Sequence, residues 1–246
     1  MSLDYFDKAA YSYDKYAVIQ QQCADYLGKK VLNISKKDQD ILDFGCGTGY
    51  LLKQFSEKLN VSGLEYSDSF SKISQQYLGK STKIYTKIED INCSFDIIVS
   101  NLTFHWIPFF DDLPKILSKL LKKNGTLIFS TALPCSFSYF KTALSETALQ
   151  CPMVINSFPR LIEIYHSFTD FFHVKHLNVS QYHIKFSNSV EILKHFKHTG
   201  TQGHANTQIW TKRKLTKIDN AFKKLADVPI LDYHIGSWHL KNKASS

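Results

Sequence analysis

A chain of 246 residues with 43% hydrophobic and 14% aromatic content has enough apolar side chains for a packed core, which excludes an intrinsically disordered protein. No apolar run approaches the ~20 residues that a membrane helix needs, and the N-terminal residues lack the apolar stretch of a signal peptide. The five cysteines are scattered without a CxxC pair, which predicts reduced thiols in a cytoplasmic protein. No boundary is apparent, so a single domain is expected over 1–246.

The net charge is +8 and the isoelectric point is near 9.1. Lysine carries the excess, because Arg160 and Arg213 are the only arginines. A basic surface attracts polyanions such as nucleic acid, anionic lipid or an acidic protein. Proteins that read nucleic acid favour arginine for bidentate contacts, whereas lysine acts as a point charge. The lysine-rich charge therefore fits non-specific electrostatic attraction of an acidic partner. It fits equally well a surface that is basic only for solubility.

The chain begins with a helical pattern and continues as alternating strands and helices. Helices are expected over 4–10 and 13–28, the second ending at Gly28. Five short apolar runs predict buried strands at 41–44, 61–66, 82–88, 95–101 and 125–132. Helices are expected between them at 48–59, after an N-cap at Asp68, and at 111–122 with Asn124-Gly125 as its stop. This alternation predicts parallel strands with right-handed crossovers, hence a doubly wound α/β sandwich.

The second half has a different pattern. Residues 136–166 read as helices broken at Cys151-Pro152 and at Phe158-Pro159. Apolar and polar residues alternate over 174–186, which is typical of an antiparallel or edge strand. Helices at 189–198 and 215–226 and a strand at 228–238 follow. Two late strands without a parallel crossover complete a seven-stranded, mostly parallel sheet with an antiparallel edge.

Three alternate glycines follow the first strand, in the stretch ILDFGCGTGYL. In open α/β sheets, ligands bind at this strand-to-helix turn. Gly45 allows the tight turn, Gly47 lets a ligand approach the backbone, and Gly49 admits close helix packing. No Lys-Ser or Lys-Thr pair follows, which excludes a P-loop, and the spacing is GxGxG instead of the GxGxxG of dinucleotide sites.

Two carboxylates flank the glycine turn. Glu65 ends the second strand, where an acid accepts hydrogen bonds from the ribose diol of a bound nucleoside. Asp43 stands just ahead of the glycines, where it would repel a diphosphate but would suit a cationic amino-acid moiety and a sulfonium. The pair therefore favours a cationic nucleoside over a pyrophosphate.

The string from Leu42 to Gly49, with Glu65 behind it, resembles the S-adenosylmethionine site of class I methyltransferases. The resemblance implies a Rossmann-like fold and S-adenosyl-L-methionine as cofactor. It implies a contact with the adenine amino group from an acid after the third strand, where Glu89-Asp90-Ile91 stand. The cofactor residues expected on this basis are Asp43, Gly45, Cys46, Gly47, Gly49, Glu65, Tyr66, Glu89, Asp90, Ile91, Asn101 and Leu102.

Two further segments narrow the resemblance. The first has the pattern F-x-x-A-A-x-x-Y-D-x-x-A, formed by Phe6, Ala9, Ala10, Tyr13, Asp14 and Ala17. The second is SNLTFHW at 100–106. Together they resemble the malonyl-acyl-carrier-protein O-methyltransferases of biotin synthesis, which commonly carry Gln where His105 stands. FST at 129–131 and YH at 233–234 also match that family.

This resemblance implies methyl transfer to the free carboxylate of malonyl-acyl-carrier protein, giving the methyl ester that enters pimeloyl synthesis. The carboxylate is ionised at neutral pH, so its attack on the methyl group needs no general base. Tyr13, in the expected lid at 1–30, is the candidate for closing the site, or else a packing tyrosine. Substrate contacts are expected from a helical insertion at 136–170.

Three substrate-side residues are singled out in that insertion. Phe137 and Phe158 resemble aromatic residues at the family's acyl entrance, although phenylalanines at the start of a helix are more often core residues. Arg160 is a candidate for a bidentate contact with the malonyl carboxylate, or else an exposed structural arginine. No histidine or cysteine spacing indicates a metal site.

The predicted partner is an acidic acyl-carrier protein that bears the malonyl thioester; nucleic acid and membrane partners are not expected, and no oligomeric state is indicated. Two groups of basic residues could steer the carrier: Lys212, Arg213, Lys214 and Lys217, and Lys115, Lys119, Lys122 and Lys123. Three alternatives remain: another small-molecule or quinone-precursor methyltransferase, an RNA methyltransferase, which would lack its usual N-P-P-Y-like residues, and a non-catalytic protein that binds S-adenosylmethionine.

Overall fold

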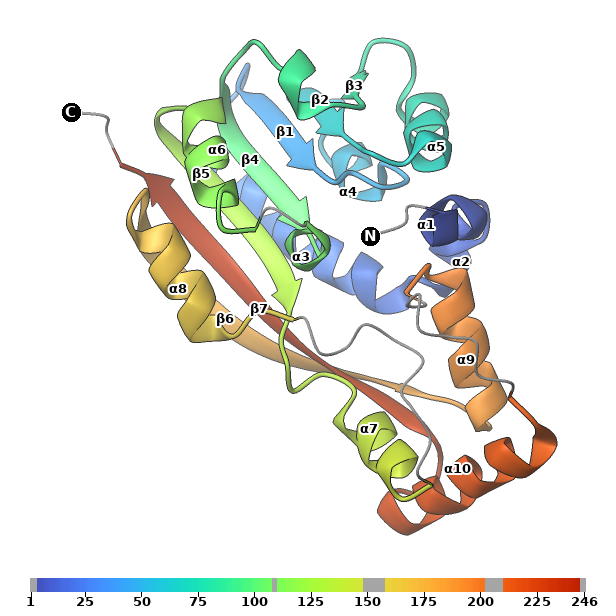
Figure 1. The fold of residues 1–246 in the computed structure, drawn as a ribbon. Helices are drawn as coiled ribbons and strands as arrows, with labels where there is room; N and C mark the ends of the chain where they lie inside the picture. Colours follow the sequence, from blue (N-terminus) through green and yellow to red (C-terminus); the bar gives the residue numbers. More distant parts are fainter. Residues whose placement is uncertain (1–3, 108–109, 148–157, 202–209, 244–246) are drawn as a thin grey trace.

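The computed structural model describes residues 4–107, 110–147, 158–201 and 210–243, which form one mixed sheet with helices on both faces (Figure 1). The strand order is β3-β2-β1-β4-β5-β7-β6. The strands are β1 (Asp40–Phe44), β2 (Asn60–Leu64), β3 (Lys83–Tyr85), β4 (Phe95–Asn101), β5 (Leu121–Ala132), β6 (Phe172–Lys185) and β7 (Ile230–Asn242). The seven-stranded, mostly parallel sheet predicted from the sequence is confirmed.

The antiparallel edge is built by the two late strands. β1 to β5 pair in parallel, whereas β7 lies antiparallel between β5 and β6. β6 is the edge strand. Exposed and half-buried residues alternate over 179–185, in step with the sequence, whereas residues 175–179 are all exposed, Leu177 and Val179 included.

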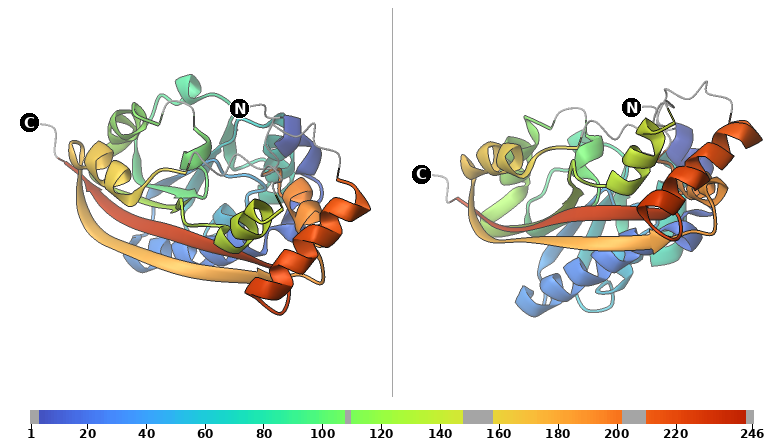
Figure 2. Two further views of the ribbon diagram at one scale, coloured as in Figure 1. Left: turned by 60° about the horizontal axis from the view of Figure 1, so that its bottom comes forward. Right: turned by 90° about the horizontal axis from the view of Figure 1, so that it is seen from below.

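Two helical layers cover the sheet (Figure 2). On one face, α3 (Val18–Ile34), α4 (Tyr50–Lys53) and α5 (Asp68–Leu78) pack on β1, β4 and β5 through a core that includes Leu27, Leu52 and Ile97. On the other face, α6 (Leu113–Leu120) and α8 (Leu161–Thr169) pack around Phe104 and Phe168. Burial of both faces accounts for the continuous apolar character of the central strands.

A third core lies where β6 and β7 extend beyond the parallel strands. It joins α7 (Ser138–Ser145), α9 (Ser189–His198) and α10 (Lys212–Leu225) through Phe140, Phe196 and Phe222. The N-terminal helices α1 (Asp4–Ala9) and α2 (Tyr13–Tyr16) lie between α5 and α9 (Figure 1). This arrangement places the N-terminal helices next to the segments that follow β1 and β2.

Two N-terminal predictions are wrong. Gly28 does not end a helix, because α3 continues to Ile34. A Cβ at Gly28 would fall 2.0 Å from the Gln54 side chain, so the glycine serves close packing between α3 and the turn after α4. The predicted helix 13–28 is interrupted at Ala17, whose ψ of 41° lies outside the helical range and separates α2 from α3.

Four local predictions need correction in the parallel half. The N-cap of α5 is Ser67, whose hydroxyl accepts from Phe70 N at 3.2 Å, and Asp68 is the first helical residue. The helix expected over 48–59 shrinks to α4 followed by turns. The helix α6 ends before the Asn124-Gly125 pair, and Asn124, with φ of 59°, lies in a bulge of β5. β3 ends at Tyr85, and two residues separate it from the 3-10 helix η1 (Ile88–Asp90).

The remaining predicted segments lie close to the observed ones. α9 has the bounds expected, and α10 begins three residues earlier than expected because Thr211 caps it. The predicted break at Cys151-Pro152 lies outside the described residues, and the break at Phe158-Pro159 precedes α8. Within the described part of the chain, no helix combines the length and apolar character needed to cross a bilayer.

Candidate active site

The glycine turn leaves β1 with three residues in left-handed conformation, at Gly45 (φ 79°), Gly47 (φ 55°) and Gly49 (φ 84°). A Cβ at Gly45 would lie 2.3 Å from Thr103, and one at Gly49 would lie 3.0 Å from Leu78 of α5. A Cβ at Gly47 would meet nothing within 4 Å. The outer glycines therefore serve packing, whereas the Gly47 backbone faces open space that a ligand can enter.

A cavity of about 300 Å³ opens at this turn, at the carboxyl ends of β1, β2 and β4. Its volume lies at the lower end of the range for small-molecule sites. Besides Gly45 and Gly47, its wall is largely aromatic, with Phe6, Tyr13, Tyr66, Phe70 and Trp106. Glu65 and Asn101 add polar atoms. An apolar wall with few polar groups suits a ligand with a flat, largely apolar ring system.

A smaller cavity of about 60 Å³ shares Tyr13, Gly45, Gly47 and Asn101 with the first and reaches Asp43. Asp43 is 1% exposed, and its Oδ1 has no hydrogen-bond partner among the described residues. Burial, and then the nearby charge of Glu65, raises the pKa of Asp43 well above its usual range. A buried acceptor without a partner is costly, and a cationic or hydrogen-bond-donating ligand would satisfy it.

Glu65 lies beneath the turn as the first residue after β2. Its Oε2 accepts from Gly47 N at 2.9 Å and its Oε1 accepts from Ser67 N at 2.9 Å. Burial raises the pKa of Glu65, while these backbone hydrogen bonds oppose the rise. The carboxylate is thus fixed beside the backbone that faces the cavity.

Tyr66 is a second unsatisfied group on the wall. Its hydroxyl is buried without a partner among the described residues. Burial, together with the charges of Glu89 and Glu65, raises the pKa of Tyr66 to about 12, so the hydroxyl keeps its proton. The expected adenine contacts Glu89, Asp90 and Ile91 border neither cavity: Glu89 and Asp90 are exposed in η1, and Ile91 is a core residue.

The N-terminal helices cover this site through hydrogen bonds of their acids. Asp7 accepts from the Ser67 hydroxyl at 2.5 Å and from Ser69 N at 3.1 Å. Asp14 accepts from the Thr48 hydroxyl at 2.9 Å. These bonds join α1 to the start of α5 and α2 to the glycine turn.

Tyr13 borders both cavities, and its ring packs edge-on against Phe70 at 5.1 Å. Burial, followed by the charges of Asp14 and Glu65, raises the pKa of Tyr13. The hydroxyl therefore stays protonated at physiological pH and is available as a hydrogen-bond donor.

The end of β4 supplies the opposite wall. The Asn101 side chain donates to Gln20 O at 2.9 Å and accepts from the Ser130 hydroxyl at 2.8 Å, and the backbone turns at Leu102 with φ of 52°. These contacts join β4 to α3 and β5, and they hold the Asn101 and Leu102 backbone at the cavity. Cys46 lies on the smaller cavity, and Gly49 borders neither.

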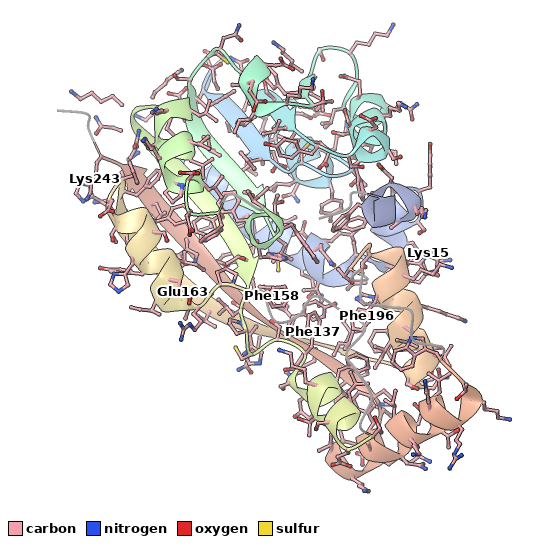
Figure 3. The ribbon with its side chains drawn as sticks, viewed as in Figure 1. Lys15, Phe137, Phe158, Glu163, Phe196 and Lys243 are labelled. Carbon is pink, nitrogen blue, oxygen red and sulfur yellow. The ribbon has the colours of Figure 1, made fainter. Side chains whose placement is uncertain are left out.

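The substrate-side candidates lie apart from the two cavities. Phe137 and Phe158 are buried, and they form a row of rings with Phe196 of α9 (Figure 3). Arg160 is exposed and pairs with Glu163 at 2.8 Å at the start of α8. Figure 3 shows Glu163 on the side of the molecule away from Lys15 of α2. The structure does not bring Arg160 to either cavity.

His105 connects the cavity wall to this row of rings. It lies next to Trp106 and packs edge-on against Phe158 at 5.1 Å. Its Nδ1 is 3.1 Å from the Thr131 hydroxyl. Burial lowers the pKa of His105 to about 3, so the ring is neutral at physiological pH and is no candidate for a cation.

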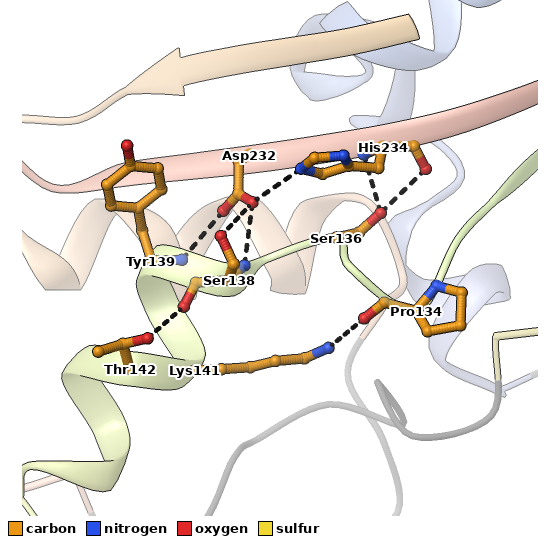
Figure 4. Close-up of polar contacts among 8 residues, drawn as sticks. All are labelled: Pro134, Ser136, Ser138, Tyr139, Lys141, Thr142, Asp232 and His234. Atoms are coloured by element: carbon orange, nitrogen blue, oxygen red, sulfur yellow. Dashed lines mark hydrogen bonds and ion pairs between the residues drawn. The ribbon is translucent and has the colours of Figure 1, made fainter. Parts of the chain in front are cut away.

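A polar network fixes α7 beside the row (Figure 4). Asp232 of β7 accepts from Ser138 N at 3.1 Å, from the Ser138 hydroxyl at 2.6 Å and from Tyr139 N at 3.1 Å. His234 lies 3.4 Å from the same carboxylate. Asp232 thus satisfies the free N–H groups at the start of α7 from a neighbouring strand.

The sequence reasoning missed several wall residues. Phe6 and Trp106 stand inside the two segments that carried the family resemblance, so that resemblance could have indicated them. Phe70 and Ile107 had no such signal. In the described part of the chain, no cluster of three or more His, Cys, Asp or Glu side chains could hold a metal ion.

Comparison with known proteins agrees with the geometry. A family model described as a methyltransferase domain matches residues 16–204. A malonyl-[acyl-carrier protein] O-methyltransferase of Calditerrivibrio nitroreducens is 32% identical, with the alignment covering 93% of this chain and 91% of that protein. A malonyl-[acyl-carrier protein] O-methyltransferase 1 of Ilyobacter polytropus is 28% identical over 92% and 88% of the two chains.

Solved structures share the fold at low sequence identity. The YcgJ protein of a Bacillus species superposes with a TM-score of 0.65 at 12% identity, covering 91% of this chain and 99% of that one. A Haemonchus contortus phosphoethanolamine N-methyltransferase 2, solved with S-adenosylhomocysteine, gives 0.52 at 14% identity over 89% and 53%. At this identity the likeness concerns the fold alone.

Proposed function

Because the chain belongs to the methyltransferase domain family, among the malonyl-[acyl-carrier protein] O-methyltransferases, we propose that it methylates the free carboxylate of malonyl-acyl-carrier protein. The methyl donor is S-adenosyl-L-methionine, which when bound supplies an electrophilic methyl group on a sulfonium. The observation that carries the proposal is that the open Gly47 backbone lies near the buried carboxylate of Asp43, whose Oδ1 has no hydrogen-bond partner among the described residues.

The cavity fits the methyl donor residue by residue. Glu65 would hold the ribose diol, since its carboxylate already lies against the Gly47 backbone. Asp43 would accept from the cationic amino-acid moiety and so gain the partner that it lacks. Tyr66, Asn101 and Leu102 would line the remaining wall.

The other expected cofactor residues have different parts. Gly45 and Gly49 would shape the turn, and Cys46 would border the smaller cavity. Glu89 would act on the adenine end through Tyr66. Asp90 and Ile91 would contribute through the backbone that holds Glu89 in η1.

The reaction requires the carboxylate oxygen, the methyl carbon and the sulfur to be aligned, and water to be excluded from the site. A malonyl carboxylate is ionised at neutral pH, so no residue needs to remove a proton. The aromatic wall and the N-terminal helices would keep water from the reacting atoms. The protonated Tyr13 hydroxyl would donate a hydrogen bond to the incoming carboxylate at the mouth between the two cavities.

Contacts with the substrate are proposed for three residues. Phe137 and Phe158 would contact the acyl thioester if it passes along the row of rings. Arg160 would have to break its ion pair with Glu163 to bind the malonyl carboxylate, so we assign it the smallest contribution to substrate binding. The product ester hides a charge, which would let the acyl chain be elongated towards the pimeloyl group of biotin.

We place the enzyme in the cytoplasm, where free thiols stay reduced. Cys23, Cys46, Cys93 and Cys135 are free cysteines in the structure.

The function is tested by incubating the protein with S-adenosylmethionine and either malonyl- or acetyl-acyl-carrier protein, followed by mass spectrometry of the carrier. A gain of one methyl group on the malonyl carrier alone is expected, because the acetyl group offers no free carboxylate. A gain on free quinone precursors, with none on the malonyl carrier, would assign the chain to a different methyltransferase reaction.

A further inference from the structure

Most of the net positive charge of the chain lies on two adjoining helices. α9 and α10 together hold eight lysine or arginine residues and two acids, a net charge of +6 with histidine neutral, out of +8 for the whole chain. α10 packs on α7 and α9, and α9 packs on α1 and α2. Figure 1 shows α9 between the N-terminal helices and α10.

The C-terminal end of α9 contacts the segment that covers the cavity. His198 Nδ1 lies 2.9 Å from the Ser12 hydroxyl, and the His198 ring stacks on Tyr16 with 4.1 Å between centroids. A Cβ at Gly200 would lie 2.7 Å from Phe6, which lines the cavity. A protein bound on α9 would therefore sit at the edge of the proposed active site.

Several exposed basic side chains on these helices have no acidic partner among the described residues. Lys194 and Lys197 on α9, and Arg213 and Lys217 on α10, are exposed, and none of the four forms an ion pair within the described residues. We refer to these four residues as the α9–α10 basic face. Unpaired exposed charges raise the rate of encounter with an oppositely charged partner.

In the second basic group, Lys115, Lys119 and Lys123 are also exposed and form no ion pair within the described residues, but the group lies around Lys122, which is paired. Lys122 binds Asp40 and Asp96, each at 2.7 Å, so its charge is already neutralised. Both acids stand at the amino ends of β1 and β4, whereas the cavity lies at the carboxyl ends. At ~3.3 Å per residue, the seven residues of β4 separate these two ends by roughly 20 Å. Charge near Lys122 would attract a partner to the wrong end of the sheet.

We propose that the α9–α10 basic face docks the acyl-carrier protein, and that the lysines of α6 and β5 take no part. This inference rests on the proposed function. The malonyl group is carried on a phosphopantetheine arm, whose phosphodiester is negatively charged, and an acidic carrier surface would complement the unpaired bases. Lysine outnumbers arginine three to one on this face, which favours an acidic protein over a nucleic acid.

The test compares two pairs of substitutions with the same spacing. Arg213→Glu/Lys217→Glu reverses two exposed charges four residues apart on α10. Lys115→Glu/Lys119→Glu does the same on α6 and serves as the matched control. Steady-state methylation is measured with malonyl-acyl-carrier protein and with malonyl-pantetheine, which has neither the carrier nor the phosphate.

With the carrier substrate, the α10 variant should lose about tenfold in kcat/KM at low salt, through KM, and the α6 variant should match the wild type. Both variants should use malonyl-pantetheine as the wild type does. Equal rates for both variants on the carrier would overturn the docking face. A loss on malonyl-pantetheine would also overturn it, because the change would then act on the site itself.

Two further outcomes separate the docking proposal from its alternatives. If the wild type methylates neither malonyl substrate, the proposed function fails. If the wild type binds single-stranded RNA more tightly than the carrier and the α10 variant loses that binding, the face is a nucleic-acid surface and the docking proposal is wrong.

Discussion

Alanine substitutions at Gly47 and at Gly79 distinguish two effects: backbone strain at a positive φ, and a clash with the bound ligand. Both have positive φ, at 55° and 85°, and a Cβ at either would meet nothing within 4 Å. Gly47 borders both cavities, whereas Gly79 ends α5 and borders neither. Substitution by alanine should therefore strain both sites, but only Gly47→Ala should place a methyl group where the ligand binds.

Gly79→Ala is expected to lose more stability than Gly47→Ala, whereas only Gly47→Ala is expected to lose affinity for S-adenosylmethionine. Gly47→Ala should lower the free energy of unfolding by about 1–2 kcal/mol, the cost of a left-handed residue with a Cβ. Gly79→Ala, at φ 85° and ψ 170°, enters a region that is almost confined to glycine and should cost about 1–3 kcal/mol. An inserted methyl group in a filled site costs about 1–3 kcal/mol, so Gly47→Ala should weaken S-adenosylmethionine by roughly 5- to 150-fold.

Thermal unfolding measures the first quantity and titration calorimetry with S-adenosylmethionine the second. For a chain of this size, 1 kcal/mol corresponds to a shift in Tm of about 2–4 °C. Gly79→Ala should be the less stable variant and Gly47→Ala the weaker binder. Wild-type affinity in Gly47→Ala, or a comparable loss in Gly79→Ala, would refute the assignment of Gly47 to the ligand.

Three further substitutions test single groups of the site. Glu65→Ala should sharply weaken S-adenosylmethionine in calorimetry, because the proposed ribose contact is lost; unchanged affinity would mean that the ribose lies elsewhere. Asp43→Asn should weaken the ligand yet stabilise the free protein at neutral pH. Because the pKa of Asp43 is raised in the folded state, the protein loses stability as the pH rises from the usual carboxyl pKa through the raised one. Asparagine does not ionise, so the variant should not show this loss. A Tm difference between pH 5 and pH 8 as large in the variant as in the wild type would contradict this. His105→Gln should raise stability by roughly 2 kcal/mol at pH 5 but little at pH 8, because a His pKa lowered to about 3 costs stability as the pH falls below the unfolded value near 6.5. Denaturant unfolding at the two pH values checks this, and equal gains at both would show that the effect is one of packing.

The positions and types of most strands could be predicted from the sequence, because the central strands are buried on both faces and the edge strand alternates apolar and polar residues. β4 was predicted with the bounds that the structure shows, since its apolar run is bounded by turns on both sides. Gly28 could not be interpreted correctly from the sequence alone. Its role depends on Gln54, which approaches it from the turn after α4 and has no local signal.

The candidate site was only partly predictable for a similar reason. The glycine turn, Asp43 and Glu65 are close together in the sequence, and their spacing alone indicates a nucleoside-binding site. The aromatic wall is assembled from positions far apart in the chain, Phe6, Phe70 and Trp106, which meet through ring contacts between α1, α5 and η2 (Phe104–Trp106). A periodicity argument assigns such phenylalanines to a core and does not distinguish a core from a cavity wall.

The most direct measurement of the central claim is a competition for a labelled methyl group. The protein is incubated with methyl-labelled S-adenosylmethionine and an equimolar mixture of malonyl-acyl-carrier protein, acetyl-acyl-carrier protein, a quinone precursor and RNA, and the products are separated. The label is expected on the malonyl carrier, as a methyl ester that mild base hydrolyses with release of labelled methanol. Label on any other component, with none on the malonyl carrier, would contradict it.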